Sequence, residues 1–166
     1  HKLKEEGHNS FAYELDICNS EEVNILFDKI FKLHKSVDCL VNAAAFAMKN
    51  LKREGAEYFA PFEDYLLKNW QKSIDVNLNG TFLVTQAVGK IMKNANKGAI
   101  VNIASDVAVI SPDHRIYEPD EKYDYEGVPF NTPASYSVSK AGVLALTRYL
   151  ATYWAPFGIR VNSISP

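Results

Sequence analysis

The sequence predicts an α/β fold built on a doubly wound parallel sheet. Short apolar runs alternate along the chain with long segments of helical periodicity, as expected when helices connect parallel strands. Two of these runs, residues 37–41 and 99–104, are almost wholly apolar, which is typical of strands covered on both faces. Of the 166 residues, 47% are hydrophobic, a fraction that is typical of a folded globular domain.

The first part of the chain is predicted to contain a strand, a helix and a second strand. Residues 10–15 alternate in polarity and predict the first strand, and residues 37–41 predict the second. Between them, Asn19 is a predicted N-cap, with Glu21 and Glu22 in the first turn, where acidic side chains complement the helix dipole. The buried face of this helix is predicted from apolar residues at helical spacing, which are Val23, Leu26, Phe27, Ile30 and Phe31.

The later part of the chain predicts two long helices and two strands. Helical periodicity begins at Glu63 and continues to about Asn94, and residues 99–104 predict a strand. Thr132 and Pro133 suit the N-cap and first position of the next helix, which runs to about residue 155. Residues 158–164 then predict the last strand. The stretches 42–61 and 111–132 have no clear period and are predicted to be irregular.

Composition and charge exclude several classes of partner. Lys and Arg number 18 and Asp and Glu number 20, so the formal charge of −2 gives no reason to expect nucleic acid or an acidic membrane surface. Cys18 and Cys39 form no CxxC pair, so we expect buried thiols in a reducing compartment and no metal site. No apolar run approaches the ~20 residues of a spanning helix, and no signal peptide is visible. We therefore expect a cytoplasmic protein without a membrane partner.

The segment YSVSK at residues 136–140 is the strongest local indication of chemistry. In a helix, positions i and i+4 lie one turn apart on the same face, so Tyr136 and Lys140 are predicted neighbours. A nearby ammonium lowers the pKa of a phenol from its usual ~10, and such a phenol can exchange a proton with an alcohol or carbonyl oxygen. Taken alone the pair is weak, because roughly one such spacing is expected by chance in a chain of this composition.

Other polar or small residues follow predicted strands or interrupt a predicted helix. Ser105 comes directly after residues 99–104, and ligands of doubly wound sheets lie beyond the carboxyl ends of the strands, where a hydroxyl can donate to a developing oxyanion. Asn77 lies within a helical pattern and indicates either a functional side chain or a kink. Asp16 is a ligand residue or a turn residue. The small residues at 42–45 permit close approach of a flat ligand, or only tight packing.

Six motifs in order give the sequence a specific resemblance to the short-chain dehydrogenase/reductase family, and they cover nearly the whole chain. They are LDI (15–17), VNAAA (41–45), DVNLNGTF (75–82), GAIVNIAS (98–105), YSVSK (136–140) and GIRVNSISP (158–166). The resemblance implies a Rossmann-like, three-layer α/β/α fold, present here in part. It also implies an oxidoreductase that transfers a hydride between a nicotinamide cofactor and a carbonyl or secondary alcohol.

The same resemblance implies roles for individual residues. Tyr136 would be the general acid/base, Lys140 would assist it, Ser105 would polarise the substrate carbonyl, and Asn77 would anchor a water in a proton relay. The implied cofactor-binding residues are Asp16 and Ile17 at the adenine, Asn42, Ala43 and Ala44 along the cofactor, and Tyr136 with Lys140 at the nicotinamide ribose. The VNAAA segment lacks the glycine of the family's commoner NNAG pattern, which alanine replaces only at negative φ.

The family's Gly-rich phosphate-binding turn has no counterpart in this sequence. We therefore expect residues 1–166 to be part of one Rossmann-like domain, from its third to its sixth strand, within a longer polypeptide or beside a second chain. We expect this fragment to bind the cofactor poorly by itself, since the pyrophosphate site at a helix N-terminus is missing. NAD and NADP are not distinguished, because the discriminating residue follows the family's second strand.

The substrate and the assembly are predicted from weaker features. The segment PDHRIYE at 112–118 is similar to that of family members in bacterial surface-sugar and flagellin-glycan pathways. A sugar or nucleotide sugar is therefore the leading expectation for the substrate. A 3-oxoacyl or small-ketone reductase is the alternative, and a non-catalytic cofactor sensor or interaction module is the second. The polar stretch 112–130 either covers the substrate or is a solvated excursion.

A homodimer or homotetramer is expected through the helices near residues 75–94 and 134–155, as in relatives. The residues expected to contribute, although some must face the sheet, are Val138, Ala141, Ala145 and Leu146.

Overall fold

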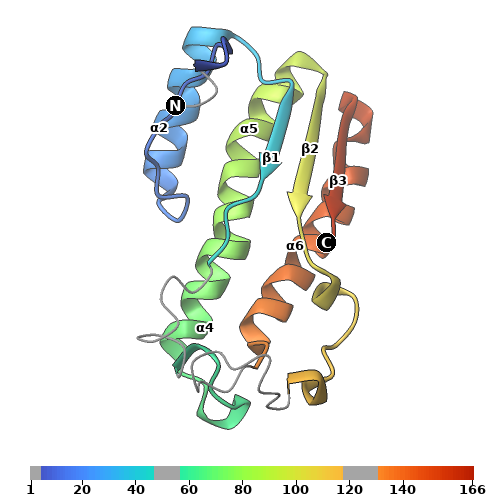
Figure 1. Ribbon diagram of the computed structural model, residues 1–166. Helices are drawn as coiled ribbons and strands as arrows, with labels where there is room; N and C mark the ends of the chain where they lie inside the picture. Colours follow the sequence, from blue (N-terminus) through green and yellow to red (C-terminus); the bar gives the residue numbers. More distant parts are fainter. Residues whose placement is uncertain (1–4, 47–56, 118–130) are drawn as a thin grey trace.

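A three-stranded parallel sheet in the order β1-β2-β3 organises the structure. The computed structural model describes residues 5–46, 57–117 and 131–166. The strands are β1 (Cys39–Asn42), β2 (Gly98–Ile103) and β3 (Ile159–Ile164). All three point the same way, so their carboxyl ends lie at one end of the sheet, which is the lower end in Figure 1.

Helices connect the strands. The main helices are α2 (Ser20–His34), α4 (Leu67–Ile74), α5 (Thr81–Ala95) and α6 (Ala134–Tyr153). A π-helical segment, η2 (Asp75–Gly80), joins α4 to α5, so the predicted long helix of residues 63–94 contains a local widening at Asn77. Short 3₁₀ turns are η1 (Phe62–Asp64), η3 (Asp106–Ala108), η4 (His114–Tyr117) and η6 (Ala155–Phe157). None of these helices is long and apolar enough to span a membrane, within the described ranges.

The start of α2 confirms the prediction from local sequence. The Asn19 side chain accepts hydrogen bonds from the backbone amides of Glu21 and Glu22 at 3.1 and 3.3 Å, and its own amide donates to the Glu22 carboxylate at 2.7 Å. This reciprocal arrangement satisfies amide groups that a helix N-terminus would otherwise leave unpaired.

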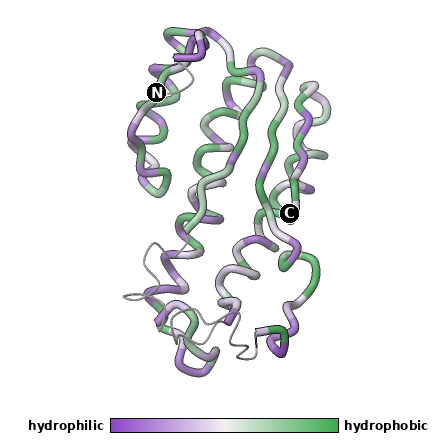
Figure 2. Tube along the Cα trace, in the orientation of Figure 1, coloured by the Kyte–Doolittle hydropathy of each residue, from purple (hydrophilic) through white to green (hydrophobic). Residues whose placement is uncertain are grey.

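One layer of helices covers the sheet in the part of the chain that is described. Helices α5 and α6 pack against the strands, and α2 packs against α5 (Figure 1). The main core lies between sheet and helices and contains Val88, Met92, Ile100, Leu150, Trp154, Ile159 and Val161. In Figure 2 the hydrophobic colour runs along β1 and β2 and alternates along β3.

The parallel α/β fold is as predicted, but the coverage of its strands is not. We predicted residues 37–41 and 99–104 as strands covered on both faces, whereas Val41 is 57% exposed and Val101 and Ile103 are only partly buried. These side chains lie on the face opposite to Leu40 and Ile100, because successive strand residues point to opposite faces. No described helix covers that second face.

The predicted strand at residues 10–15 is wrong, since the structure describes this segment without regular secondary structure. Its alternating pattern suits a strand, but a strand also needs a neighbour that pairs with its backbone amides and carbonyls. The described sheet ends at β1, which pairs with β2 on one side only.

The start of α6 also differs from the prediction. Pro133, not Thr132, occupies the N-cap position, and no side chain caps the helix there. The Thr132 hydroxyl is instead hydrogen-bonded to the Tyr117 hydroxyl at 2.7 Å. A tertiary partner has therefore replaced the local cap that the sequence pattern favours.

Gly89 sets how closely α5 approaches the end of α6. A Cβ at this position would lie 2.2 Å from the Trp154 ring, in a core where both residues are buried. We predict that Gly89→Ala lowers the free energy of unfolding by about 1–3 kcal/mol, measured by denaturant titration, because it overpacks the core. In a Trp154→Leu background the same alanine should cost much less, and an equal cost in both backgrounds would contradict this explanation.

Candidate active site

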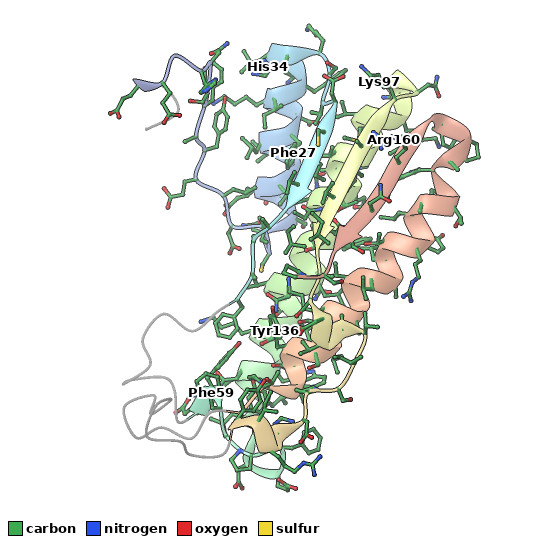
Figure 3. The ribbon with its side chains drawn as sticks, turned by 45° about the vertical axis from the view of Figure 1, so that its right-hand side comes forward. Phe27, His34, Phe59, Lys97, Tyr136 and Arg160 are labelled. Carbon is green, nitrogen blue, oxygen red and sulfur yellow. The ribbon has the colours of Figure 1, made fainter. Side chains whose placement is uncertain are left out.

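Tyr136 lies in the first turn of α6, beyond the carboxyl ends of the strands. Figure 3 shows it at this end of the molecule, on the same side as Phe59. Tyr136 is half-buried, and its backbone amide donates to the Pro133 carbonyl at 3.0 Å. The residues that the sequence singled out after β1 and β2 belong to the same end of the sheet, as expected for parallel strands.

Lys140 connects Tyr136 to β2. Its side-chain amine donates to the carbonyl oxygen of Ile103, the last residue of β2, at 2.6 Å. The same nitrogen lies 5.8 Å from the centroid of the Tyr136 ring. Lys140 is only 4% exposed, and this burial lowers the pKa of its amine. The predicted neighbourhood of Tyr136 and Lys140 is thus present in the structure.

Ser105 follows β2 and is buried, with 7% of its surface exposed. Its hydroxyl donates to the Asp106 carboxylate at 2.9 Å, and that carboxylate also accepts from the Val107 amide at 2.7 Å. The turn η3 that begins at Asp106 packs against α6, the helix of Tyr136 and Lys140. Ser105 therefore comes two residues after the carbonyl that holds Lys140.

Asn77 is almost completely buried, at 1% exposure, within the π-helical segment η2. Its side-chain oxygen accepts from the Phe46 amide at 2.6 Å, and its side-chain amide donates to the Ser139 hydroxyl at 3.0 Å. Ser139 in turn donates to the Tyr136 carbonyl at 2.9 Å. Asn77 thus links the segment after β1 to the turn of α6 that carries Tyr136. Such π-helical widenings occur frequently at functional sites.

The Asn42 side chain lies against the helices that cover the sheet. Its amide donates to Thr85 and to Asn102, both at 2.8 Å, and the Asn102 amide donates to Thr147 at 2.9 Å. Asn42 therefore joins two strands to α5 and α6, a contribution to stability that the sequence reasoning missed. Ala43 and Ala44, which follow it, are exposed.

Asp16 and Ile17 lie just before α2. Asp16 is exposed, and its carboxylate accepts from the Cys18 amide at 2.9 Å, as in a turn. Ile17 packs against the cluster of Val23 and Val84, and a Cβ on Gly80 would lie 2.6 Å from its side chain. These two residues are thus close to the end of η2, the segment that contains Asn77.

An aromatic cluster near Tyr136 was not predicted from the sequence. The ring of Tyr58 meets Phe46 and Phe59 edge to face, with centroids 5.6 and 5.2 Å apart. Burial, with smaller effects of Tyr65 and Tyr136, raises the pKa of Tyr58 to about 12. The aromatic residues before Pro61 were the available signal, but they lie in a stretch without periodicity.

The predicted substrate-covering stretch 112–130 lies mostly outside the described residues. Its first part forms η4, where the Arg115 guanidinium pairs with the Asp113 carboxylate at 2.6 Å on the surface. A cavity of about 330 Å³ lies between η1, residues 111–114 and the start of α6. Its lining includes Tyr65, Ser111, His114, Thr132 and Ser137.

The chain resembles proteins of one family along its whole length. It matches the family model described as short chain dehydrogenase over residues 1–117, and the one described as Enoyl-(Acyl carrier protein) reductase over residues 122–166. D-threitol dehydrogenase of Mycolicibacterium smegmatis is 34% identical over 160 residues, which are 96% of this chain and 50% of that protein.

Solved structures give the same result. The NAD⁺-bound xylitol dehydrogenase has a TM-score of 0.79 and 30% identity, over 99% of this chain and 53% of that one. ElxO with NADP bound has a TM-score of 0.73 and 26% identity, over 93% of this chain and 51% of that one. This chain therefore spans about half the length of the relatives it matches. The prediction of a Rossmann-like fold that is present in part is confirmed, and the chain belongs to the short-chain dehydrogenase/reductase family.

Proposed function

We propose that the protein containing this chain transfers a hydride between a nicotinamide cofactor, NAD or NADP, and a carbonyl or secondary alcohol. The observation that carries the proposal is the buried amine of Lys140, which lies between the end of β2 and the ring of Tyr136. Burying a lysine is costly, and side chains with such perturbed pKa values cluster at functional sites.

The described residues fit the nicotinamide half of such a cofactor. One proton of the Lys140 ammonium is used by the Ile103 carbonyl, which leaves two donors for ribose hydroxyls. Ala43 and Ala44 are exposed and small, so the backbone after β1 is open to close approach by a flat ligand.

Asp16 and Ile17 are proposed to contact the adenine of the cofactor, and the Asp16 carboxylate is exposed. For Asn42 we propose a supporting role through the sheet, because its side chain bonds to Thr85 and Asn102.

In the proposed reaction the cofactor supplies or accepts the hydride, and this chain's residues handle the proton. During reduction, the phenol of Tyr136 gives its proton to the substrate oxygen as that oxygen gains negative charge, and oxidation reverses this transfer. The positive charge of Lys140 favours the resulting phenolate. The Ser105 hydroxyl exchanges its hydrogen bond to Asp106 for one to the substrate oxygen. Asn77 holds Ser139 and the Tyr136 carbonyl in place and is proposed to border the water of a proton relay.

A polyhydroxylated substrate, a sugar, nucleotide sugar or polyol, is the proposed substrate class. The dehydrogenases named above act on D-threitol and xylitol by their names. The lining of the cavity beside the start of α6 includes, among apolar side chains, Tyr65, Ser111, His114 and Ser137. The hydroxyl and imidazole groups of these four residues suit hydroxylated ligands. The alternative, a 3-oxoacyl or small-ketone reductase, is supported by a relative from Synechocystis that is named 3-oxoacyl-[acyl-carrier-protein] reductase and is 29% identical over 160 residues.

A non-catalytic sensor or interaction module is less well supported, because Asn77, Ser105, Tyr136 and Lys140 are all present. The assignment of residues 1–166 to part of one larger Rossmann-like domain is also proposed. It is supported by the uncovered edge and face of β1 and by the half-length match to relatives. A cytoplasmic location stays a prediction.

The enzymatic assignment is tested by Tyr136→Phe in the protein at its natural length. We expect kcat for reduction of a hydroxylated ketone to fall about 10²- to 10⁴-fold, because the proton donor is removed while cofactor binding is retained. Steady-state kinetics and cofactor fluorescence titration measure the two effects. Tyr13→Phe, which changes a tyrosine before α2, is the matched control and should keep wild-type turnover. Unchanged turnover of Tyr136→Phe would refute the assignment.

Self-association through α5 and α6 is proposed for the whole protein. A groove of about 370 Å³ runs between these helices, and exposed aromatic side chains of Phe82, Tyr149 and Tyr153 border it. Of the residues expected at a subunit contact, Val138, Ala141 and Ala145 are exposed, whereas Leu146 packs against the main core. Exposed apolar surface on adjacent helices is typical of a protein interface.

Ala145→Glu at natural length should convert the oligomer to a smaller species, because it introduces a charge into an apolar contact. Light scattering coupled to size-exclusion chromatography measures the mass. Ala12→Glu, at an exposed position before α2, should keep the wild-type mass. An unchanged mass of Ala145→Glu would show that this face is not the subunit contact.

A further inference from the structure

We propose that Tyr65, Ser73 and Ser135 form a buried hydroxyl chain that positions Tyr136 for proton transfer. The inference rests on the proposed function of Tyr136 and adds three positioning residues to it. The three side chains come from the segment after η1, from α4 and from the first turn of α6. Ser73 and Ser135 are completely buried, and Tyr65 is half-buried.

The chain of hydrogen bonds has a defined direction. The Ser135 hydroxyl donates to the Ser73 hydroxyl at 3.0 Å, and the Tyr65 and Ser135 hydroxyl oxygens are 2.9 Å apart. Because a serine hydroxyl has only one hydrogen, and that of Ser135 is used on Ser73, Tyr65 must be the donor to Ser135. The removal of either outer partner therefore leaves a buried hydroxyl with one interaction fewer.

This chain of hydroxyl groups is one of two successive hydrogen-bonded contacts between the α4–η2 segment and α6. Buried residues repeat every four positions along α4, η2 and α5, and again along α6. The two rows bond to each other at their first two positions, whereas Thr85 and Thr147 further along bond to asparagines of the strands. The first row is Ser73, Asn77, Thr81 and Thr85, and the second is Ser135, Ser139, Val143 and Thr147. Ser73 bonds to Ser135, and Asn77 bonds to Ser139 one turn further along. A spacing of four residues keeps successive side chains on one face of each helix.

Tyr136 lies between the two residues of α6, Ser135 and Ser139, that make these contacts. Ser135 precedes it, and Ser139, which follows one turn later, donates to the Tyr136 carbonyl. These contacts matter because Pro133, the N-cap residue of α6, provides no side-chain hydrogen bond, so the first turn of the helix lacks the usual local restraint. The bond of Ser135 to α4 supplies a lateral restraint instead. A displacement of about 1 Å at a reacting group costs on the order of 10²-fold in rate, so a loosened first turn should be visible in kcat.

Tyr65 places the outer end of this chain at the cavity beside α6. Its side chain lines that cavity together with Pro133 and Ala134, the residues at the start of the helix. The hydroxyl of Tyr65 is thus the only part of the chain, among the described residues, that belongs to a half-buried side chain. Tyr65→Phe removes this hydroxyl without changing the ring, and it is the mildest test of the proposal.

The test compares Tyr65→Phe, Ser135→Ala and the double variant in the protein at its natural length. We expect each single variant to lower kcat about tenfold, to leave the KM of the cofactor unchanged, and to move the pH at which kcat is half-maximal. The double variant should lower kcat by less than the product of the single effects, because both changes interrupt one chain. The matched control is Thr147→Val, which removes a buried hydroxyl bonded to Asn102 further along the same helix. It should lower the Tm but leave kcat and its pH dependence unchanged.

The proposal is overturned if Tyr65→Phe and Ser135→Ala change only the Tm, as Thr147→Val does. It is also overturned if their effects on kcat multiply. Should Ser135→Ala fail to fold, Tyr65→Phe alone decides by its kcat and its pH profile. Failure of the proposed function is recognised separately, because in that case Tyr136→Phe itself retains turnover.

Discussion

The hydrogen bond between the buried side chains of Asn77 and Ser139 is the interaction on which the geometry of the site depends. Polar groups that are buried between two helices must find partners, so such a bond fixes the position of one helix along the other. Tyr136 and Lys140 are the neighbours of Ser139 on α6, and they are fixed with it. The bond of Lys140 to the Ile103 carbonyl then ties the same turn to the carboxyl end of β2.

Buried polar side chains that pair with one another also align the strands with the helices. Asn42, Asn102 and Thr147 join β1, β2 and α6 through side-chain hydrogen bonds in the otherwise apolar layer between strands and helices. The apolar core around Met92 and Trp154 supplies most of the buried surface, whereas the polar contacts determine how the elements are aligned. The proposed chemistry thus lies at the end of the sheet where aligned helices meet the carboxyl ends of the strands. Relatives twice as long as this chain share that part of the fold.

The sequence predicted the features that depend on local physics. Asn19 with Glu22 predicted the start of α2 because a cap needs only neighbouring residues, and the spacing of Tyr136 and Lys140 predicted their proximity. Features that depend on distant partners were missed. Residues 10–15 have a strand pattern but no pairing neighbour in the described sheet, and Thr132 bonds to Tyr117 instead of capping α6. The hydrogen bonds of the Asn42 side chain to Thr85 and Asn102 depend on the strand register. The role proposed for Ser73 and Ser135 depends on the hydrogen bond between them, which joins residues far apart in the sequence.

The most direct test of this account is hydrogen–deuterium exchange of the Ser139→Ala variant at natural length. If the bond to Asn77 fixes this turn, exchange of the amides of residues 137–141 should accelerate more than exchange of residues 145–150, which lie further along the same helix. Strand amides of β2 should keep their protection. Equal acceleration along the whole of α6, or no change near Tyr136, would contradict the account.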